Sequence, residues 1–467
     1  MALTIPEVAA NARTAANQLQ NVTSTQKSQV LAHIRRELEA HKEEIFAANA
    51  QDLQLAQEEV AKGRLSASLF KRLDIKGDNE EKFNTLLQGV TDVDNLPDPI
   101  GQVTRATELD QGLDLYRVTA PVGVILVIFE ARPEVVVNIS CLSIKSSNAA
   151  ILKGGKEAYH TLAVLTRVMQ SAIEGVVQDI PFPKDAIQLV STREHIDELL
   201  QQDRYIDMVI PRGSNQLVRH IQNNTRIPVL GHADGLCSIY LDDTADVNKA
   251  PGLVVDSKTN YPAACNSAET LLVHRSLLGS DLLTKTIKSL FDHGVSLRCD
   301  PPTLQFIENS PVLGSASYKK DQQYSASTDE DYDTEFLDLC MAVKVVDSVE
   351  EAITHINTHG SKHTDCIVTE TPAHAEKFMN MVDAAGVYYN ASTRFADGFR
   401  YGFGTEIGVS TNKTHARGPV GLEGLTIYKY RLYGQGHKAG DFGVGANKKA
   451  YLHNDIGVDS VKNKFVR

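Results

Sequence analysis

From residue 120 onwards, short apolar runs rich in β-branched residues alternate with longer amphipathic segments. Residues 122–129 and 149–153 have the composition of buried strands, whereas residues 161–177 have the periodicity of a helix. Parallel strands need a crossover long enough to hold a helix, so this order favours parallel sheets with helices on both faces. A second alternating set occupies residues 252–420. We therefore expect an α/β fold with two parallel-sheet domains.

Residues 103–118 break this pattern. Two short alternating runs flank Asp110-Gln111-Gly112, which is a typical hairpin signal. A hairpin inside an α/β chain often pairs outside its own domain, for example with a neighbouring subunit. The glycine-rich segment that begins at Gly434 is expected to be mobile.

The charge balance narrows the range of partners. The 467 residues carry a net charge of −12, which argues against nucleic acid or an anionic membrane, because both select basic surfaces. The longest apolar run, residues 121–129, is shorter than the roughly 20 residues of a membrane span. Residues 1–20 lack the basic start and apolar stretch of a secretory signal. The sequence thus predicts a cytoplasmic protein with no membrane partner.

Six cysteines occur, and no two share the C-x-x-C spacing of zinc ribbons or thioredoxin-like motifs. No H-E-x-x-H motif is present either, so no metal site is predicted. Cys265 lies on a predicted loop, with small residues before it and Asn266 after it. Such a cysteine is either an accessible thiolate stabilised by backbone N–H groups or an ordinary packed thiol.

Two segments have the character of nucleotide-binding turns. A predicted strand leads into Gly213-Ser214 and a helix, and the N–H groups at a helix N-terminus favour a pyrophosphate. Lys153 and Lys156 flank two glycines at the end of another predicted strand, where ligands bind in open α/β folds. The alternatives are an ordinary N-cap serine and a solvated basic turn.

An ordered set of segments along the chain carries a resemblance. Its members are Phe129-Glu-Ala-Arg-Pro-Glu134, Ile151-Leu-Lys-Gly-Gly-Lys156, Tyr261-Pro-Ala-Ala-Cys-Asn266, His359-Gly-Ser-Lys-His-Thr-Asp365, Asn390-Ala-Ser-Thr-Arg394 and Gly404-Thr-Glu-Ile-Gly-Val-Ser-Thr411. Together they resemble the aldehyde dehydrogenase superfamily, and within it the branch that reduces L-glutamyl 5-phosphate.

The resemblance implies a domain plan. The NADPH-binding domain is expected in residues 1–240, interrupted by a hairpin at 100–118, and the catalytic domain in residues 241–420. Residues 100–118 and 421–435 are expected to form a small β oligomerisation element of a homodimer or homotetramer. Residues 436–467 remain as a C-terminal tail.

The resemblance also assigns roles to single residues. Cys265 matches the nucleophile, and Lys153 matches the lysine that contacts the adenosine ribose. Gly213 and Ser214 match the start of the pyrophosphate helix. Glu335 matches the glutamate that holds the nicotinamide ribose.

Three positions depart from the pattern of the superfamily. Val229 stands where many oxidising members have the glutamate that activates water, which fits an acyl-enzyme that is reduced rather than hydrolysed. Lys156 replaces an acidic residue and so favours the 2′-phosphate of NADPH. Ala131 replaces the oxyanion-binding asparagine, which leaves the backbone N–H of Cys265 and, less strongly, Asn266 as donors.

The activity implied is NADPH-dependent reduction of L-glutamyl 5-phosphate to L-glutamate 5-semialdehyde, with release of phosphate, through a cysteinyl thioester in proline biosynthesis. A functional association with glutamate 5-kinase is expected. Another oxidising or CoA-acylating aldehyde dehydrogenase, or a non-catalytic scaffold, is the alternative.

The anionic substrate calls for arginines near the nucleophile. Arg132, Arg394 and Arg417 are the candidates, although a structural salt bridge explains each of them equally well. His274 and His363 are interpreted as buried histidines with structural partners.

Overall fold

The computed structural model describes residues 3–65, 67–177, 179–190, 196–315 and 318–467. The chain divides into two compact units. Unit 1 comprises Met1–Leu230, Phe403–Gly408 and Val420–Arg467, and unit 2 comprises Gly231–Gly402 and Val409–Pro419, apart from the positions outside the described ranges.

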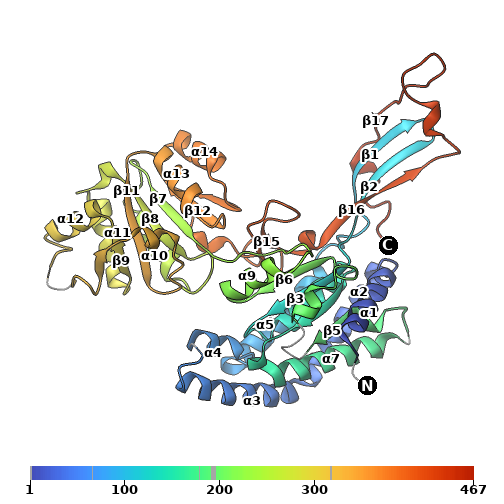
Figure 1. Ribbon diagram of the computed structural model, residues 1–467, viewed down its shortest axis with the longest axis horizontal. Helices are drawn as coiled ribbons and strands as arrows, with labels where there is room; N and C mark the ends of the chain where they lie inside the picture. The colour runs from blue at the N-terminus through green and yellow to red at the C-terminus, as the bar shows by residue number, and fades with distance from the viewer. Residues whose placement is uncertain (1–2, 66, 178, 191–195, 316–317) are drawn as a thin grey trace. The chain divides into compact units, whose positions relative to one another are not determined.

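The described part of unit 1 contains a four-stranded parallel sheet in the order β5-β4-β3-β6 (Figure 1). Every residue of the central strand β3 is buried, because this strand has a neighbour on each side and helices above and below. This position explains the long apolar run in the sequence. The strands are β3 (Val124–Phe129), β4 (Ala149–Lys153), β5 (Ile187–Val190) and β6 (Met208–Arg212).

Helices pack around this sheet and on one another. Helix α2 begins after Thr23, whose hydroxyl accepts a hydrogen bond from the backbone N–H of Gln26 at 3.2 Å. Helices α1 and α6 contact β4, while α2 packs on α5 and α7. The main helices are α1 (Ile5–Leu19), α2 (Ser24–Ala40), α3 (Lys42–Ala61), α5 (Glu81–Asn95), α6 (Val135–Lys145), α7 (Tyr159–Val177) and α9 (Asn215–Asn224).

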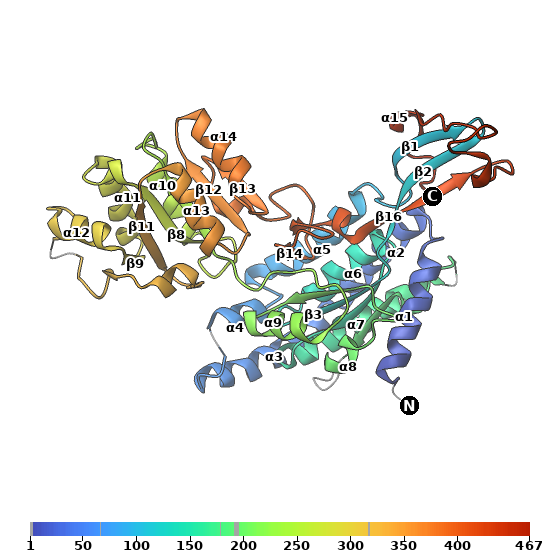
Figure 2. The same cartoon turned by 45° about the horizontal axis from the view of Figure 1, so that its top comes forward.

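A second, antiparallel sheet in unit 1 has the order β16-β2-β1-β17. The predicted hairpin forms its centre. The segment expected to be a mobile tail instead completes this sheet: β17 pairs with β1, Phe465 lies edge-on to Tyr116, and Figure 2 shows α15 beside β1. The elements are β1 (Val103–Asp110), β2 (Leu113–Pro121), β16 (Thr426–Tyr433), β17 (Asn454–Asp455) and α15 (Val458–Val461).

Unit 2 is built on a parallel sheet whose described strands follow the order β10-β9-β11-β8-β7-β12-β13. These strands are β7 (Cys237–Leu241), β8 (Ala268–His274), β9 (Ser296–Cys299), β10 (Tyr324–Ala326), β11 (Cys340–Val346), β12 (Thr364–Val368) and β13 (Gly386–Tyr389).

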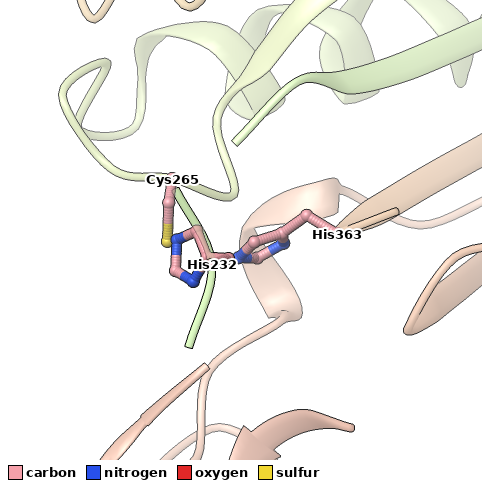
Figure 3. A group of neighbouring side chains, drawn as sticks. All are labelled: His232, Cys265 and His363. Carbon is pink, nitrogen blue, oxygen red and sulfur yellow. The ribbon is translucent and has the colours of Figure 1, made fainter. Parts of the chain in front are cut away.

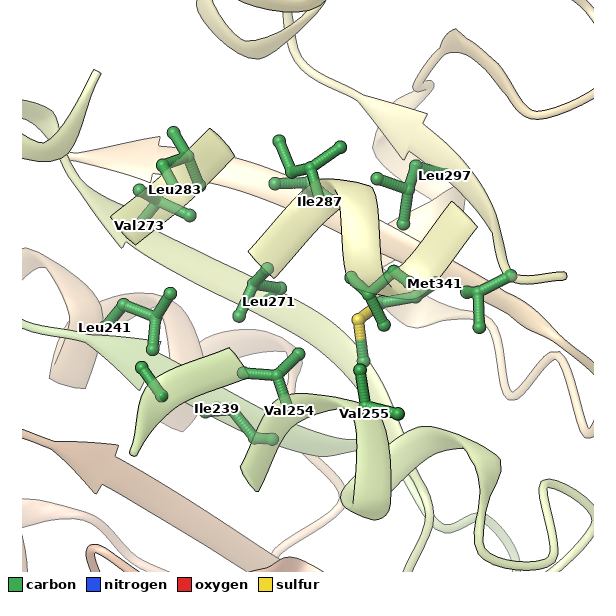
Figure 4. Close-up of a cluster of buried hydrophobic side chains, with 14 of the residues drawn as sticks. Ile239, Leu241, Val254, Val255, Leu271, Val273, Leu283, Ile287, Leu297 and Met341 are labelled. Atoms are coloured by element: carbon green, nitrogen blue, oxygen red, sulfur yellow. The ribbon is translucent and has the colours of Figure 1, made fainter. Parts of the chain in front are cut away.

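Helices cover both faces of this sheet. Helices α10 (Ala250–Thr259) and α11 (Asp281–Asp292) close one apolar core, in which Leu271, Val254 and Ile287 are fully buried (Figure 4). Helices α13 (Val349–His359) and α14 (Pro372–Met381) bury Ile367 and Phe378 in a separate cluster. The prediction of an α/β fold with two parallel-sheet units and a small β element is confirmed.

Candidate active site

Cys265 lies on the loop that joins α10 to β8, and its side chain is half-buried. The chain turns at Tyr261, four residues before Cys265, where φ is 66°. The backbone N–H of Ala264 donates to the Tyr261 carbonyl oxygen at 3.1 Å. A side chain at position 235 would clash with the carbonyl group of Cys265, so glycine at 235 allows the two backbones to approach. The loop is thus held tightly against a neighbouring segment.

Two imidazoles lie beside this thiol. The Sγ of Cys265 and one ring nitrogen each of His232 and His363 lie within 4.8 Å of one another, and Figure 3 shows the three side chains converging from separate segments. The two rings meet edge to face, with centroids 4.9 Å apart and an interplanar angle of 81°. The sequence interpretation did not single out His232.

Neighbouring oxygens orient both rings. His232 Nδ1 lies 2.9 Å from the carbonyl oxygen of Val409. Because a carbonyl oxygen can only accept a hydrogen bond, Nδ1 carries the proton. His363 Nδ1 lies 2.9 Å from Thr364 Oγ1. The Nε2 of His363 is buried and has no hydrogen-bond partner among the described residues. His363 is therefore not the fully satisfied structural histidine that the sequence suggested, whereas His274 Nδ1 does lie 2.8 Å from Ser276 Oγ.

The electrostatic surroundings distinguish Cys265 from other cysteines of the chain. Burial raises its pKa, but the charges of His363 and His232 outweigh burial, so that the pKa lies well below its ordinary value of 9.0. Burial instead raises the pKa of Cys141 and of Cys366 to about 12. Cys265 thus has the properties of a nucleophilic thiolate.

A half-buried carboxyl group, that of Glu335, also lies near this site. Burial and, secondarily, the charge of Cys265 raise the pKa of Glu335 to about 7, although the backbone N–H of Gly235 donates a hydrogen bond to it. Glu335 lies in unit 2 with Cys265, whereas Lys153, Gly213 and Ser214 lie in unit 1.

Asn266, the predicted side-chain donor to an oxyanion, follows Cys265 directly. Its side chain is buried, and Nδ2 donates to the Ala396 carbonyl oxygen at 2.8 Å. Its Oδ1 is buried without a hydrogen-bond partner in the described structure. One of the two N–H groups of the amide is thus engaged by the protein, and a role of Asn266 as an oxyanion donor stays a prediction.

The three candidate arginines have different environments. Arg394 is only 9% exposed, and its Nε has no hydrogen-bond partner among the described residues. Burial and the neighbouring Arg400 lower the pKa of Arg394, while the charge of Cys265 raises it. Arg400 donates to the Arg394 carbonyl oxygen. Arg394 therefore lies within electrostatic reach of both the thiol and Arg400, a residue that the sequence did not single out.

Arg132 and Arg417 both take part in ion pairs. Arg417 lies 2.9 Å from Asp383, whose pKa is held well below its ordinary value by hydrogen bonds from Lys413 and Arg417. Arg132 lies in unit 1, where it is 3.8 Å from Glu134. For these two arginines, the ion pairs favour a structural role over substrate binding.

The predicted cofactor residues of unit 1 lie at the carboxyl ends of its strands. Lys153 ends β4, is buried, and donates to the Gly154 carbonyl oxygen at 2.5 Å, whereas Lys156 is exposed on the following turn. A cavity of about 260 Å³ lies beside them, lined by Gly154, Gly155, Thr166 and other residues of α7 and β5.

The turn after β6 contains the second pair of predicted cofactor residues, Gly213 and Ser214. Ser214 is the N-cap of α9, and its hydroxyl accepts from the Leu217 N–H. The backbone N–H of Ser214 donates to the carboxylate of Glu130 at 2.8 Å, and a side chain at position 213 would clash with that carboxylate. The N-terminus of α9 thus already holds an anionic group.

Among the helices that the structure describes, none is both long and apolar enough to cross a lipid bilayer.

The sequence matches the aldehyde dehydrogenase family over residues 2–334. The protein of Schizosaccharomyces pombe named "Probable gamma-glutamyl phosphate reductase" is 50% identical over 459 residues, which are 98% of this chain and 99% of that protein. The gamma-glutamyl phosphate reductase of Saccharomyces cerevisiae is 49% identical and covers 97% of this chain and 98% of its own length. The crystal structure of gamma-glutamyl phosphate reductase from Thermotoga maritima is 34% identical, covers 93% of this chain and 99% of that chain, and has a TM-score of 0.84.

Proposed function

Because the chain belongs to the aldehyde dehydrogenase family, and within it to the γ-glutamyl phosphate reductases, we propose that it reduces L-glutamyl 5-phosphate to L-glutamate 5-semialdehyde with release of phosphate. The reaction is a step of proline biosynthesis. The observation that carries the proposal is the thiol of Cys265 between two imidazoles, which lower its pKa.

The first half of the reaction forms an acyl-enzyme. The Cys265 thiolate attacks the acyl carbon, the bond to the phosphate oxygen breaks, and a thioester results. The leaving phosphate takes up one proton, which the imidazolium of His363 or His232 is placed to give. After reduction of the thioester carbon, the C–S bond breaks, the aldehyde leaves and the thiolate returns.

Residue 229 supplies no base for hydrolysis of this intermediate. Val229 has an apolar side chain that accepts no proton, where oxidising relatives need a base. The thioester therefore persists long enough to be reduced.

Unit 1 offers a site that fits a dinucleotide cofactor. Its cavity, which Gly154 and Gly155 help to line, and the anion-holding N-terminus of α9 lie at the carboxyl ends of parallel strands. Lys153 is proposed to hold the adenosine ribose, and Gly213 with Ser214 the pyrophosphate. When bound, NADPH supplies the hydride that reduces the thioester.

Two further residues are proposed to contact the cofactor. The exposed ammonium group of Lys156 attracts a 2′-phosphate and so favours NADPH over NADH. Glu335 is proposed to hold the nicotinamide ribose next to Cys265.

Arg394 and Arg400 are proposed to bind the anionic groups of the substrate. A buried guanidinium whose Nε lacks a partner is costly unless an anion completes its hydrogen bonds. A phosphate or carboxylate matches the planar geometry of arginine. Of the three arginines predicted from the sequence, Arg394 is therefore retained, and Arg400 is proposed in place of Arg132 and Arg417, which are ion-paired.

We also propose that the protein is a cytoplasmic homodimer or homotetramer, and that it works with glutamate 5-kinase. Strand β16 is an edge strand of the small sheet and exposes Tyr430 and Leu432, which are 56% and 58% exposed. An apolar edge of this kind suits pairing with a second copy of the chain.

The reaction in reverse provides the test. An oxidising member of the family converts the aldehyde and NADP⁺ without phosphate, a CoA-acylating member needs CoA, and a non-catalytic scaffold does neither. The proposal predicts NADPH formation from glutamate 5-semialdehyde that requires phosphate and is unaffected by CoA. Sustained turnover at the same rate without phosphate would rule it out.

A further inference from the structure

The three side chains around Cys265 have the chemistry and arrangement of a metal-binding site. One thiol sulfur and two imidazole nitrogens lie within 4.8 Å of one another. They come from three separate segments of unit 2, so no local sequence motif predicts that they lie together. We propose that Cys265, His232 and His363 bind a single zinc ion in the substrate-free protein, and that the bound zinc blocks acylation.

The surroundings of the rings support this site. Ligating histidines usually donate their other N–H to a carbonyl or carboxylate, which fixes the ring and leaves the opposite nitrogen for the metal. His232 makes this bond to the Val409 carbonyl oxygen through Nδ1, so Nε2 is its ligating atom. His363 holds Nδ1 against Thr364, and its buried Nε2 has no hydrogen-bond partner in the described part of the chain.

The donor set selects the kind of ion. Zinc takes thiolate sulfur at about 2.3 Å and imidazole nitrogen at about 2.0–2.1 Å, usually with four ligands in tetrahedral geometry. Magnesium and calcium prefer oxygen ligands instead. Three protein ligands leave a fourth position for water. The three donor atoms lie within 4.8 Å of one another, so each is near enough to the others to share one ion after the side chains adjust.

Metal binding and acylation exclude each other at this site. Zinc uses the same sulfur lone pair with which the thiolate would attack the acyl carbon, and any proton on Sγ is released to solvent when the ion binds. The zinc site itself rests on the three side chains, because metal binding is measured without substrate or cofactor, whereas the block of acylation rests on the proposed function. A failed reductase assay would therefore leave the zinc site intact and would remove only the block of acylation.

Cobalt provides a direct readout, because a cobalt–thiolate bond gives an intense charge-transfer absorption. The metal-free protein, prepared with a chelator, is titrated with Co²⁺ and then with Zn²⁺. We expect a charge-transfer band that saturates at about one Co²⁺ per chain and that Zn²⁺ removes. Cys265→Ser should abolish the band, and His363→Asn should weaken metal binding by about ten-fold or more.

Two matched variants test whether the site is the one proposed. Cys340→Ser removes another half-buried thiol, and His374→Asn removes a ring that lies with Asp242 and Asp243 in a second three-donor group. Both should keep the band. Absence of the band in the wild-type protein, its retention in Cys265→Ser or its loss in His374→Asn would overturn the proposal.

A second measurement needs no variant. Zn²⁺ should protect Cys265 from alkylation by iodoacetamide, and a chelator should restore the reaction, with peptide mass mapping to identify the modified cysteine. Equal alkylation of Cys265 with and without Zn²⁺ would also overturn the proposal.

Discussion

The carboxylate of Glu130 accepts a hydrogen bond from the backbone N–H of Ser214 at 2.8 Å and so covers the N-terminus of α9. This is the position proposed for the pyrophosphate of the cofactor, and two anionic groups there repel each other. Glu130→Gln should therefore lower the Kd for NADPH about two- to five-fold, because the amide keeps an acceptor without the charge. Fluorescence titration measures this change.

An exposed carboxylate on α3 serves as the control for that variant. Glu43→Gln removes the same charge away from the turn and should leave the Kd unchanged. Weaker binding by Glu130→Gln would show that the carboxylate assists the cofactor instead of competing with it.

Loss of either imidazole should raise the pKa of Cys265. In the wild-type protein, the thiolate persists as the pH falls below 9.0, because His363 and His232 stabilise its charge. Alkylation of Cys265 in His363→Asn should therefore be slower by about ten-fold or more at neutral pH, and equal to wild type well above pH 9.0. The rate is followed by mass spectrometry with a chelator present. A pH profile identical to that of wild type would contradict the role of His363.

The fold was largely predictable because its signal is local. Buried parallel strands such as residues 124–129 are apolar at every position, and the intervening helices have their own periodicity. The segment after Gly434 was misjudged because glycines suggest mobility, whereas its ordering depends on long-range contacts, such as that of Phe465 with Tyr116. No local pattern encodes contacts of that range.

The candidate site was predictable only where the family pattern names a residue. Cys265 was singled out in this way, but His232 and Arg400 were not. His363 was interpreted as structural, although its buried Nε2 faces no partner among the described residues. His232 and Asp234 stand between Gly231 and Gly235, and such a short glycine-bounded segment is a local signal for His232. Residues that come together only in the folded protein, such as His232 and Cys265, have no characteristic spacing in the sequence.

Arg394 should affect substrate binding more than turnover. Arg394→Lys keeps the charge but loses the planar pair of donors, and the KM for L-glutamyl 5-phosphate should rise about ten-fold or more. Steady-state kinetics separates KM from kcat. Arg417→Lys is the control, since Arg417 is already paired with Asp383 and its replacement should change KM by less than about two-fold. Equal effects of the two variants would remove Arg394 from the proposed site.

Glu335 should destabilise the folded protein at high pH. Its pKa is raised from 4.5 to about 7, mainly by burial, so the folded state resists its ionisation. The loss of folding stability caused by ionising Glu335 is absent below pH 4.5, grows as the pH rises and is complete above about pH 7. Glu335→Gln should thus increase the free energy of unfolding at about pH 8 by up to about 3 kcal/mol, and hardly at all at about pH 4.5. Denaturant titration at the two pH values checks this, and a gain that is the same at both would contradict it.

The central claim is that Cys265 carries the acyl group and that the acyl-enzyme resists water. Mixing the protein with glutamate 5-semialdehyde and NADP⁺ without phosphate tests both parts at once. We predict a burst of about one NADPH per subunit, no further turnover, and a glutamyl adduct on Cys265 by mass spectrometry, all absent in Cys265→Ala. A burst that persists in Cys265→Ala, or steady turnover of the wild type without phosphate, would contradict the account.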